Sequence, residues 1–356
     1  MKAAFAAALA ILAIPAATAA QPLRWQPDCV GRMEVMIPDR VDVSAHTFAN
    51  FRARLDSSKP GHPQAEFRDG ETAWHGAHSW YDGSVVVSQQ LIDAEWETLR
   101  ANGLTVREES TRRSKSLPPA VVGMALPAPA ALRRADGVTW GLRAYGALLR
   151  VGEHAVLWRS AGGIQASVTT FVAMDEGLVK RGLHEVPTTS GVCLPFAFIT
   201  DRDSTVRKIS TTYRSQDHPD VQIAIEDASA AEPTAGMNSR VLDPEPVMAG
   251  HWDQLLTQAR EIQPAWTPAG RPVTIAGYRG LASFMQITRD DGTVDFGYMA
   301  VVRGDPKATT DTPDLMVYVI QDGKRAVSKG AKPIDRASFL ALAEAVTRGV
   351  RRRVTQ

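Results

Sequence analysis

The sequence predicts an α+β protein of two domains, each a mainly antiparallel sheet packed against one or a few helices. Apolar residues alternate along "TVDFGYMAVV", which is the pattern of a half-buried strand. A stripe of apolar residues at helical spacing lies near the C-terminal end. Between two strand-rich regions lies "ASAAEPTAGMNSRVLDPEPVMAG", whose prolines and lack of periodicity are typical of a connection between domains.

The N-terminal residues have the features of a secretory signal peptide. A positive charge at Lys2 precedes an apolar run from Ala3 to Ile14, and small residues follow, with expected cleavage near Ala19 or Ala20. A membrane-spanning helix needs roughly 20 apolar residues, so this run is too short for an anchor. No cysteine stands directly after the cleavage region to accept a lipid. We therefore expect residues 1–20 to be removed and the protein to be periplasmic.

The charge balance of the mature chain limits the classes of partner. Without Lys2 the chain has equal numbers of basic and acidic residues. Nucleic acids and anionic membrane surfaces both attract proteins with a basic excess. No later segment has the length of a membrane span. We therefore expect no nucleic-acid partner and no stable membrane insertion.

The chain contains two cysteines, Cys29 in "DCVGRMEVMIP" and Cys193 in "GVCLPFAFI". In an oxidising compartment an even number of cysteines indicates disulfides, and only one pairing exists here. A bridge that closes so long a loop stabilises the fold by about 5 kcal/mol at most in the loop-entropy treatment. Two separate buried thiols are the alternative, and the export signal favours the disulfide.

The N-terminal half is predicted to be mainly sheet. "CVGRMEVMIPDRVDV" has the composition of a strand that is interrupted at Pro38. In "SQQLIDAEWETLRANG", Ile92, Trp96 and Leu99 have helical spacing, and Gly103 marks the expected end of the helix. Further strands are expected at 138–150, 155–159 and 164–173, and in "GVCLPFAFI", "VRKISTTYRS" and "DVQIAIEDA".

The C-terminal region is predicted to be an antiparallel meander covered by one helix. "GLASFMQIT" and "TVDFGYMAVV" flank the glycine-containing turn "RDDG", and "DLMVYVI" is a third strand that ends at an Asp322–Gly323 turn. A helix begins at about Arg336 with Asp335 as its N-cap. The arginines after this helix are expected to complement its dipole. Its apolar stripe consists of Phe339, Leu342, Val346 and Val350.

These patterns divide the chain into three parts after the signal peptide. Residues 21–227 form the predicted N-terminal domain, and residues 263–356 form the C-terminal domain. Residues 228–262 form the linker, whose last part, "HWDQLLTQAREI", has the pattern of a helix.

No catalytic motif is found in the sequence. The chain lacks a G-x-S-x-G elbow, an H-E-x-x-H site, a P-loop and a Rossmann fingerprint. His75 and His78 would need a third ligand to hold a metal, and loop or packing histidines are the favoured interpretation. The segment "RDDGTVD" faintly resembles a calcium loop, but it lacks the required glutamate spacing and fits a hairpin turn better. We expect no catalytic residue, no cofactor and no metal.

Three aromatic residues, Trp74, Trp80 and Tyr81, lie close together among polar residues. Aromatic anchors dominate many protein–protein interfaces, so these residues are candidates for partner binding. The alternative is that they are core residues of a strand–turn region, and this is the more usual role of aromatics in such a context.

Several segments together resemble a known family. An early "CVGRMEVMIPDRVDV", a later "GVCLPFAFI" and "PDVQIAIED" are similar to segments of the immunity proteins for lipase effectors of the type VI secretion system, specifically the fourth lipase-effector family. The C-terminal "VTIAGYRGLASFMQI", the hairpin, "DLMVYVI" and a terminal helix ending in arginines are similar too. The resemblance covers most of the mature chain, as an N-terminal and a C-terminal immunity domain.

The resemblance implies a periplasmic binding protein without catalytic activity. Its two α+β lobes would form a claw that grips the lid of a cognate phospholipase effector and keeps the active site closed. It assigns no individual contact residue, because the matching motifs are structural. Two alternatives stay open: a periplasmic binding or scaffold protein of unrelated purpose, and a secreted hydrolase whose nucleophile and base are not evident in the sequence.

Overall fold

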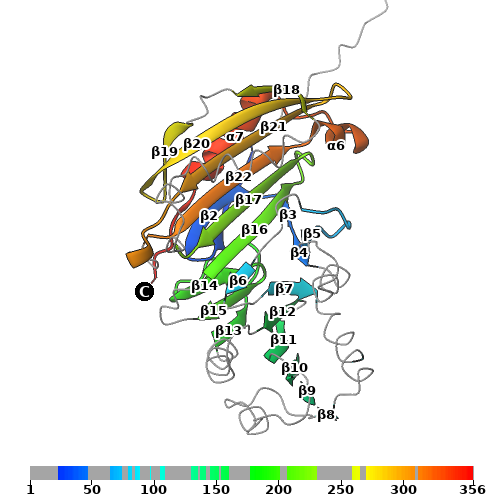
Figure 1. The fold of residues 1–356 in the computed structure, drawn as a ribbon, viewed down its shortest axis with the longest axis vertical. Coiled ribbons are helices and arrows are strands. Elements are labelled where there is room, and N and C mark those ends of the chain that lie inside the picture. The colour runs from blue at the N-terminus through cyan, green and yellow to red at the C-terminus, as the bar shows by residue number, and fades with distance from the viewer. Residues whose placement is uncertain are drawn as a thin grey trace, which may run out of the picture.

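The computed structural model describes residues 23–46, 65–73, 79–81, 85–88, 97, 105–108, 130–134, 137–141, 145–151, 154–159, 177–200, 207–230, 259–264, 270–308 and 312–355. Across these residues the fold is α+β and mainly antiparallel, as predicted. A large twisted sheet dominates the molecule, helix α7 lies on one of its faces, and a smaller group of strands continues beyond the β16 side of that sheet (Figure 1).

The large sheet has nine strands in the order β18-β20-β21-β22-β17-β16-β3, with β19 also paired to β20 and β6 also paired to β16. Its strands are β3 (Val41–Val43), β6 (Ser79–Tyr81), β16 (Arg207–Ser215), β17 (Val221–Ala228), β18 (Ala259–Pro264), β19 (Arg271–Ile275), β20 (Tyr278–Arg289), β21 (Val294–Val302) and β22 (Asp314–Gln321).

Three smaller sheets complete the described fold. One contains β1 (Trp25–Val30), β2 (Met33–Pro38) and β23 (Arg351–Arg352), and a second contains β13 (Leu178–Lys180), β15 (Ala197–Thr200) and β14 (Gly191–Leu194). The third has eight strands: β5 (Ala65–Glu66), β4 (Ala45–His46), β7 (Val85–Ser88), β12 (His154–Arg159), β11 (Tyr145–Val151), β10 (Gly137–Gly141), β9 (Ala130–Arg134) and β8 (Thr105–Glu108). The helices are α6 (Gly323–Ser328), α7 (Arg336–Arg348) and the short 3-10 helix η2 (Pro306–Ala308).

The predicted alternation in β21 is confirmed. Phe296, Tyr298 and Ala300 lie in the main core beneath α7, whereas Met299 and Val301 belong to a cluster on the opposite face of the sheet. This is what a strand requires when successive side chains point to opposite faces. Both sets are buried, so the large sheet is covered on both faces along this strand.

The hairpin turn between β20 and β21 is also confirmed. Asp291 accepts hydrogen bonds from the amide of Thr293 at 3.0 Å and from its hydroxyl at 2.6 Å. Asp295, by contrast, pairs with Arg289 across the base of the hairpin at 2.6 Å. The acidic residues of "RDDGTVD" therefore cap and brace a turn.

Helix α7 begins where the sequence predicts. The Asp335 side chain accepts hydrogen bonds from the amides of Ala337 and Ser338, both at 3.0 Å, as an N-cap does. The predicted stripe is buried, and the Phe339 ring lies 6.0 Å from the ring of Phe284 and 5.5 Å from that of Phe296. This aromatic cluster fixes the helix on the large sheet.

Three predicted elements are corrected. "CVGRMEVMIPDRVDV" is not one interrupted strand, because β1 and β2 form a hairpin with Val30 opposite Met33. Asp322 and Gly323 do not form a simple turn: Asp322 accepts from the amide of Arg325 at 3.0 Å and caps the short helix α6. Residues 259–262, predicted as helix, belong to β18, since pairing with β20 outweighs the local helical pattern.

Some predictions lie outside the described residues. These are the signal peptide at 1–20, nearly all of the helix predicted at 88–103, the strand at 164–173 and most of the linker. The two-domain division at 228–262 therefore stays a prediction. The large sheet does continue across that interval, because β17 on one side pairs over its whole length with β22 on the other.

This pairing generates a test. A specific protease site inserted between residues 236 and 240 should be cut, since connections with small and polar residues are preferred cleavage sites. We expect the two fragments to co-elute in native size-exclusion chromatography, because β17 and β22 hold them together. Both cysteines lie in the first fragment, so the disulfide does not contribute to their co-elution. Separation of the fragments without denaturant would contradict the continuous sheet.

Candidate functional site at the junction of the sheets

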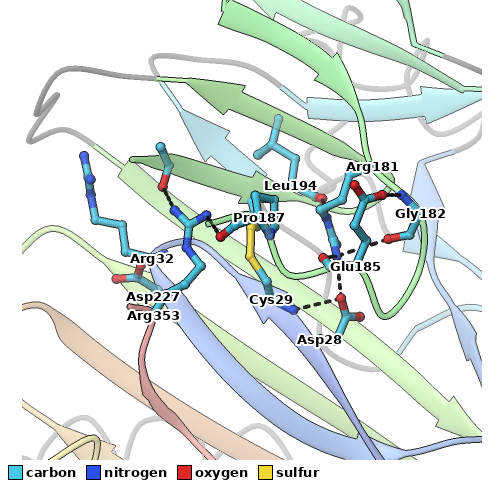
Figure 2. The surroundings of a disulfide bond; sticks show 12 residues. Asp28, Cys29, Arg32, Arg181, Gly182, Glu185, Pro187, Leu194, Asp227 and Arg353 are labelled. Carbon is cyan, nitrogen blue, oxygen red and sulfur yellow. Dashed lines mark hydrogen bonds and ion pairs between the residues drawn. A yellow bond between two sulfur atoms is a disulfide. The ribbon is translucent and has the colours of Figure 1, made fainter. Parts of the chain in front are cut away.

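A disulfide joins the two three-stranded sheets. Cys29 of β1 and Cys193 of β14 are bonded, with their Cα atoms 5.8 Å apart, and both residues are fully buried. Beside the bridge, Gly31 and Cys193 exchange backbone hydrogen bonds of 2.9 and 2.8 Å. The predicted pairing is therefore present, and it lies at the centre of a group of buried charges (Figure 2).

The first buried charge pair is Asp28 with Arg181. One carboxylate oxygen of Asp28 accepts from Arg181 and from the Cys29 amide at 2.8 Å, and the other accepts from the Tyr213 hydroxyl at 3.0 Å. Arg181 also donates to the carbonyl of Leu194 at 3.2 Å. Burial raises the pKa of Tyr213, and the Asp28 carboxylate raises it further, so the hydroxyl stays neutral and acts as a donor. The pair thus ties β1 to β14 and β16.

The second pair is Arg207 with Asp227, and neither side chain is exposed. Arg207 donates through Nε and Nη2 to the two carboxylate oxygens, both at 2.9 Å, in the two-pronged geometry favoured by guanidinium groups. Asp227 also accepts the amide of Arg32 at 2.7 Å. Gly31 has φ +58°, and a Cβ there would lie 2.2 Å from the Asp227 carboxylate. The β1–β2 turn therefore needs glycine to reach this acid.

The third buried arginine, Arg353, comes from the C-terminal end of the chain. It donates to the carbonyls of Pro187, at 2.9 Å, and of Gly191, and its guanidinium lies 5.0 Å from the centroid of the Phe198 ring. Figure 2 shows it on the opposite side of the disulfide from Arg181. Arg353 thereby braces the segment that leads into β14.

The predicted role of the terminal arginines is corrected. Arg351 and Arg352 form β23, which pairs with Met33 and Glu34 of β2, and Arg353 is buried. Strand pairing turns the chain away from α7 after the helix ends. Arg351 and Arg352 therefore belong to the sheet, and Arg353 contacts backbone carbonyls of the junction.

The structure brings together the two predicted cysteines. Trp80 and Tyr81 lie on β6, opposite Lys208 and Arg207 of β16, at an edge of the large sheet. Trp74, His75 and His78 lie outside the described residues. The partner-binding role of the three aromatics therefore stays a prediction.

Sequence reasoning missed the buried charges of the junction, because Arg181, Arg207 and Arg353 are far from their partners along the chain. Of these charged residues, only Asp28 could have been singled out in the sequence, because it is next to Cys29.

Within the described ranges, no three His, Cys, Asp or Glu residues lie together in a way that suits a metal ion. Of the helices in the same ranges, none is long and apolar enough to cross a membrane. The junction is an arrangement of paired charges that holds backbone segments in place.

The fold and the junction define a sheet-rich α+β protein. Its β1–β2 hairpin, its central strands and its C-terminal strand are joined by one disulfide and by the contacts of three buried arginines. Residues 185–355 match the family model described as the Tle cognate immunity protein 4 C-terminal domain. This region is similar to that domain family, and the match confirms the resemblance found in the sequence. The family domain begins before the predicted linker, so it includes β14 to β17 together with the C-terminal strands.

Solved structures resemble nearly the whole chain. The immunity protein TplEi of Pseudomonas aeruginosa, complexed with an "L" peptide, matches with a TM-score of 0.58 and 14% identity over 93% of this chain and 99% of that one. Its apo structure gives 0.56 and 15%, covering 93% and 98%. A Tle4–Tli4 complex gives 0.54 and 16%, also covering 93% and 98%. At these identities the likeness establishes a shared fold. No curated protein matches the sequence.

The disulfide is open to a direct test. Replacing both cysteines by serine should lower the free energy of unfolding by about 2–5 kcal/mol, because the unfolded chain is no longer cross-linked. Urea unfolding curves measure the change. A reductant should destabilise the wild type and leave the double variant unaffected. Free thiols at both positions, found by non-reducing peptide mapping of exported protein, would contradict the bridge.

Arg353 and its neighbour Arg352 offer a matched pair of substitutions. Arg353→Ala should lower the free energy of unfolding by about 2–4 kcal/mol, because charge-assisted hydrogen bonds to two carbonyls are lost. Arg352 is exposed, so Arg352→Ala should change it by less than about 0.5 kcal/mol. Thermal and urea unfolding measure both effects. Equal effects of the two substitutions would show that Arg353 does not stabilise the junction.

Proposed function

We propose that this chain is a periplasmic immunity protein that binds a lipase effector of the type VI secretion system and inhibits it without catalysis. The observation that carries the proposal is the match of residues 185–355 to the Tle cognate immunity protein 4 C-terminal domain. The likeness of nearly the whole chain to immunity proteins, one of them solved in a Tle4–Tli4 complex, supports it.

The construction of the junction suits a protein that acts by binding. Association costs free energy wherever side chains and loops become ordered, and a preorganised protein reduces that cost. Here a disulfide and three buried arginines fix the segments around β1, β14 and the C-terminal strand before any partner arrives. The same groups are engaged with one another and buried, so they are suited to support a surface and unsuited to catalysis.

A periplasmic location is supported by two features. The N-terminal residues have the pattern of a secretory signal peptide. The Cys29–Cys193 disulfide fits an oxidising compartment, because cytosolic reductants keep most thiols reduced. Both features support a location in which a lipase delivered into the cell envelope would act.

For the mode of inhibition, we propose that the protein grips the lid of the lipase and prevents it from opening. A lipase whose lid stays closed does not expose its active site to lipid, so binding alone is sufficient. The described fold contains two extended sheet regions, the nine-stranded and the eight-stranded sheet, which provide separate surfaces for such a grip. The inhibitor is not consumed and the lipase is not chemically changed.

The test begins with the neighbouring genes: where one of them encodes a lipase, the purified mature protein is titrated into that lipase. Phospholipid hydrolysis should stop at a fixed molar ratio, and the two proteins should co-elute. We expect a nanomolar Kd, about −12 kcal/mol, and an interface of at least ~1,600 Å². Full lipase activity at micromolar inhibitor, without a complex, would favour a periplasmic binding protein of unrelated purpose. Ester hydrolysis by the protein alone would favour the hydrolase alternative.

A further inference from the structure

The chain passes directly from the nine-stranded sheet into the eight-stranded sheet at Ser44. β3 pairs with β16 up to Val43, and the Ser44 amide donates to the carbonyl of Thr212 at 3.0 Å. The next residue, Ala45, already belongs to β4 and pairs with Glu66 of β5. A single extended connection leaves backbone dihedrals free to rotate, so it cannot by itself fix the angle between two sheets.

A small hairpin at residues 65–73 lies beside this connection. The Ala73 amide donates to the carbonyl of Ala65 at 2.7 Å, and the Phe67 amide donates to that of Glu71 at 2.8 Å. Asp69 accepts the Glu71 amide at 3.2 Å, which shapes the turn. The hairpin starts with β5, so it is part of the eight-stranded sheet, and its turn carries two carboxylates.

Arg214 of β16 bonds this hairpin back to the nine-stranded sheet. It donates to Asp69 at 2.8 Å, to Glu71 at 2.6 Å and to Asp42 of β3 at 2.7 Å, and its side chain is only 8% exposed. Its guanidinium also lies 4.5 Å from the centroid of the Phe67 ring. One planar cation thus contacts three groups of the hairpin and one acid of its own sheet.

Helix α6 and the residue that caps its C-terminal end add two more cations to the same contact. Arg325 pairs with Glu71, and Lys329 lies 3.0 Å from Glu71 and 3.7 Å from Asp69. Burial acts to raise the pKa of Asp69, but the hydrogen bond and charge of Arg214, with Lys329 and Arg325, outweigh it and lower that pKa. Asp69 is therefore ionised wherever the protein is folded near neutral pH, and the contact is a charged one.

A second contact of the eight-stranded sheet is aromatic, and it is made with the three-stranded sheet of β13, β14 and β15. The rings of His154, on β12 of the eight-stranded sheet, and Phe196, in the β14–β15 turn, stack with centroids 4.0 Å apart and planes at 5°. This stack lies on a different strand pair from the Arg214 cluster. The Arg214 cluster and the chain crossing therefore restrain the eight-stranded sheet against the nine-stranded sheet, and the aromatic stack restrains it against the sheet of β13, β14 and β15.

We infer that Arg214 is a positioning residue that sets the orientation of the eight-stranded sheet relative to the nine-stranded sheet, and that this orientation governs binding of the lipase. The second part rests on the proposed function. If both sheets contact the lipase at once, only molecules in the correct orientation bind, and the apparent Kd rises as their fraction falls.

The sharpest variant is the double substitution Asp69→Asn with Glu71→Gln. It removes the two carboxylate charges of the hairpin that contact Arg214 and leaves the Arg214–Asp42 pair within the nine-stranded sheet intact. Both side chains are partly exposed, at 39% and 31%, so the fold should tolerate the changes. The matched control is Arg40→Gln, which removes an ion pair with Asp217 nearby without touching the hairpin.

The orientation is measured without the lipase, from the distance between spin labels on the two sheets. Arg150 in β11 and Asp290 in the β20–β21 turn are exposed and suit labelling after substitution by cysteine. The chain's two native cysteines are joined to each other. We expect a narrow distance distribution for the wild type and for Arg40→Gln, and a broader or shifted one for the double variant.

Binding is measured in parallel with the neighbouring lipase. If the binding-competent orientation falls to about a tenth of the molecules, Kd rises about tenfold in the double variant, while Arg40→Gln keeps the wild-type value. Arg214→Lys, which keeps the charge but loses the planar fork, should give an intermediate broadening and an intermediate Kd. Should the double variant not fold, Glu71→Gln alone should shift both measurements in the same direction.

The outcomes separate the two proposals. An unchanged distance distribution in the double variant overturns the positioning role. A changed distribution with an unchanged Kd overturns the link to binding. A wild type that does not bind the lipase overturns the proposed function, and the distance measurement still tests Arg214.

Discussion

The antiparallel pairing of β17 with β22 is the interaction on which the rest of the structure depends. It runs from Val221 opposite Gln321 to Ala228 opposite Asp314, and it joins strands that precede and follow the long connection between them. On one side of this pair the meander of β20, β21 and β22 supports α7. On the other side β16 supports β3 and β6, and through Ser44 it borders the eight-stranded sheet. The positions of α7, β3 and β6 therefore depend on a sheet whose central strands, β17 and β22, come from distant parts of the chain.

The buried ions around the disulfide explain how several short segments are placed with few residues. A buried charge without its partner is costly, so each arginine requires one particular arrangement of the backbone around it. Arg181 requires Asp28 and the Leu194 carbonyl, and Arg207 requires Asp227. The disulfide adds a covalent restraint at the same place. Hydrophobic packing alone would accept more than one arrangement of β1 and β14.

The sequence allowed prediction of the elements whose signals are local. The β20–β21 hairpin, the Asp335 cap and the stripe of α7 depend on neighbouring residues, and each lies where expected. The cysteine pairing followed from an even count and an export signal. The β1–β2 hairpin was missed because its turn is shaped by contact with Asp227, nearly two hundred residues away. The strand β18 was missed because its conformation depends on pairing with β20 and not on the helical pattern of its own residues. The buried arginines of the junction have no signal in the sequence, since any arginine also suits an exposed position.

The position of Arg353 has a consequence for the order in which the molecule is completed. If the chain is exported as proposed, the hairpin of β1 and β2 and Cys193 leave the export machinery before residues 351–353, because they precede them in the sequence. The disulfide can therefore close while β2 still has a free edge and while the Pro187 and Gly191 carbonyls still face water. Only when residues 351–353 arrive does β23 cover that edge and the guanidinium enter the junction. On this order of emergence the disulfide can hold β1 beside β14 before the C-terminal residues add the last contacts of the junction.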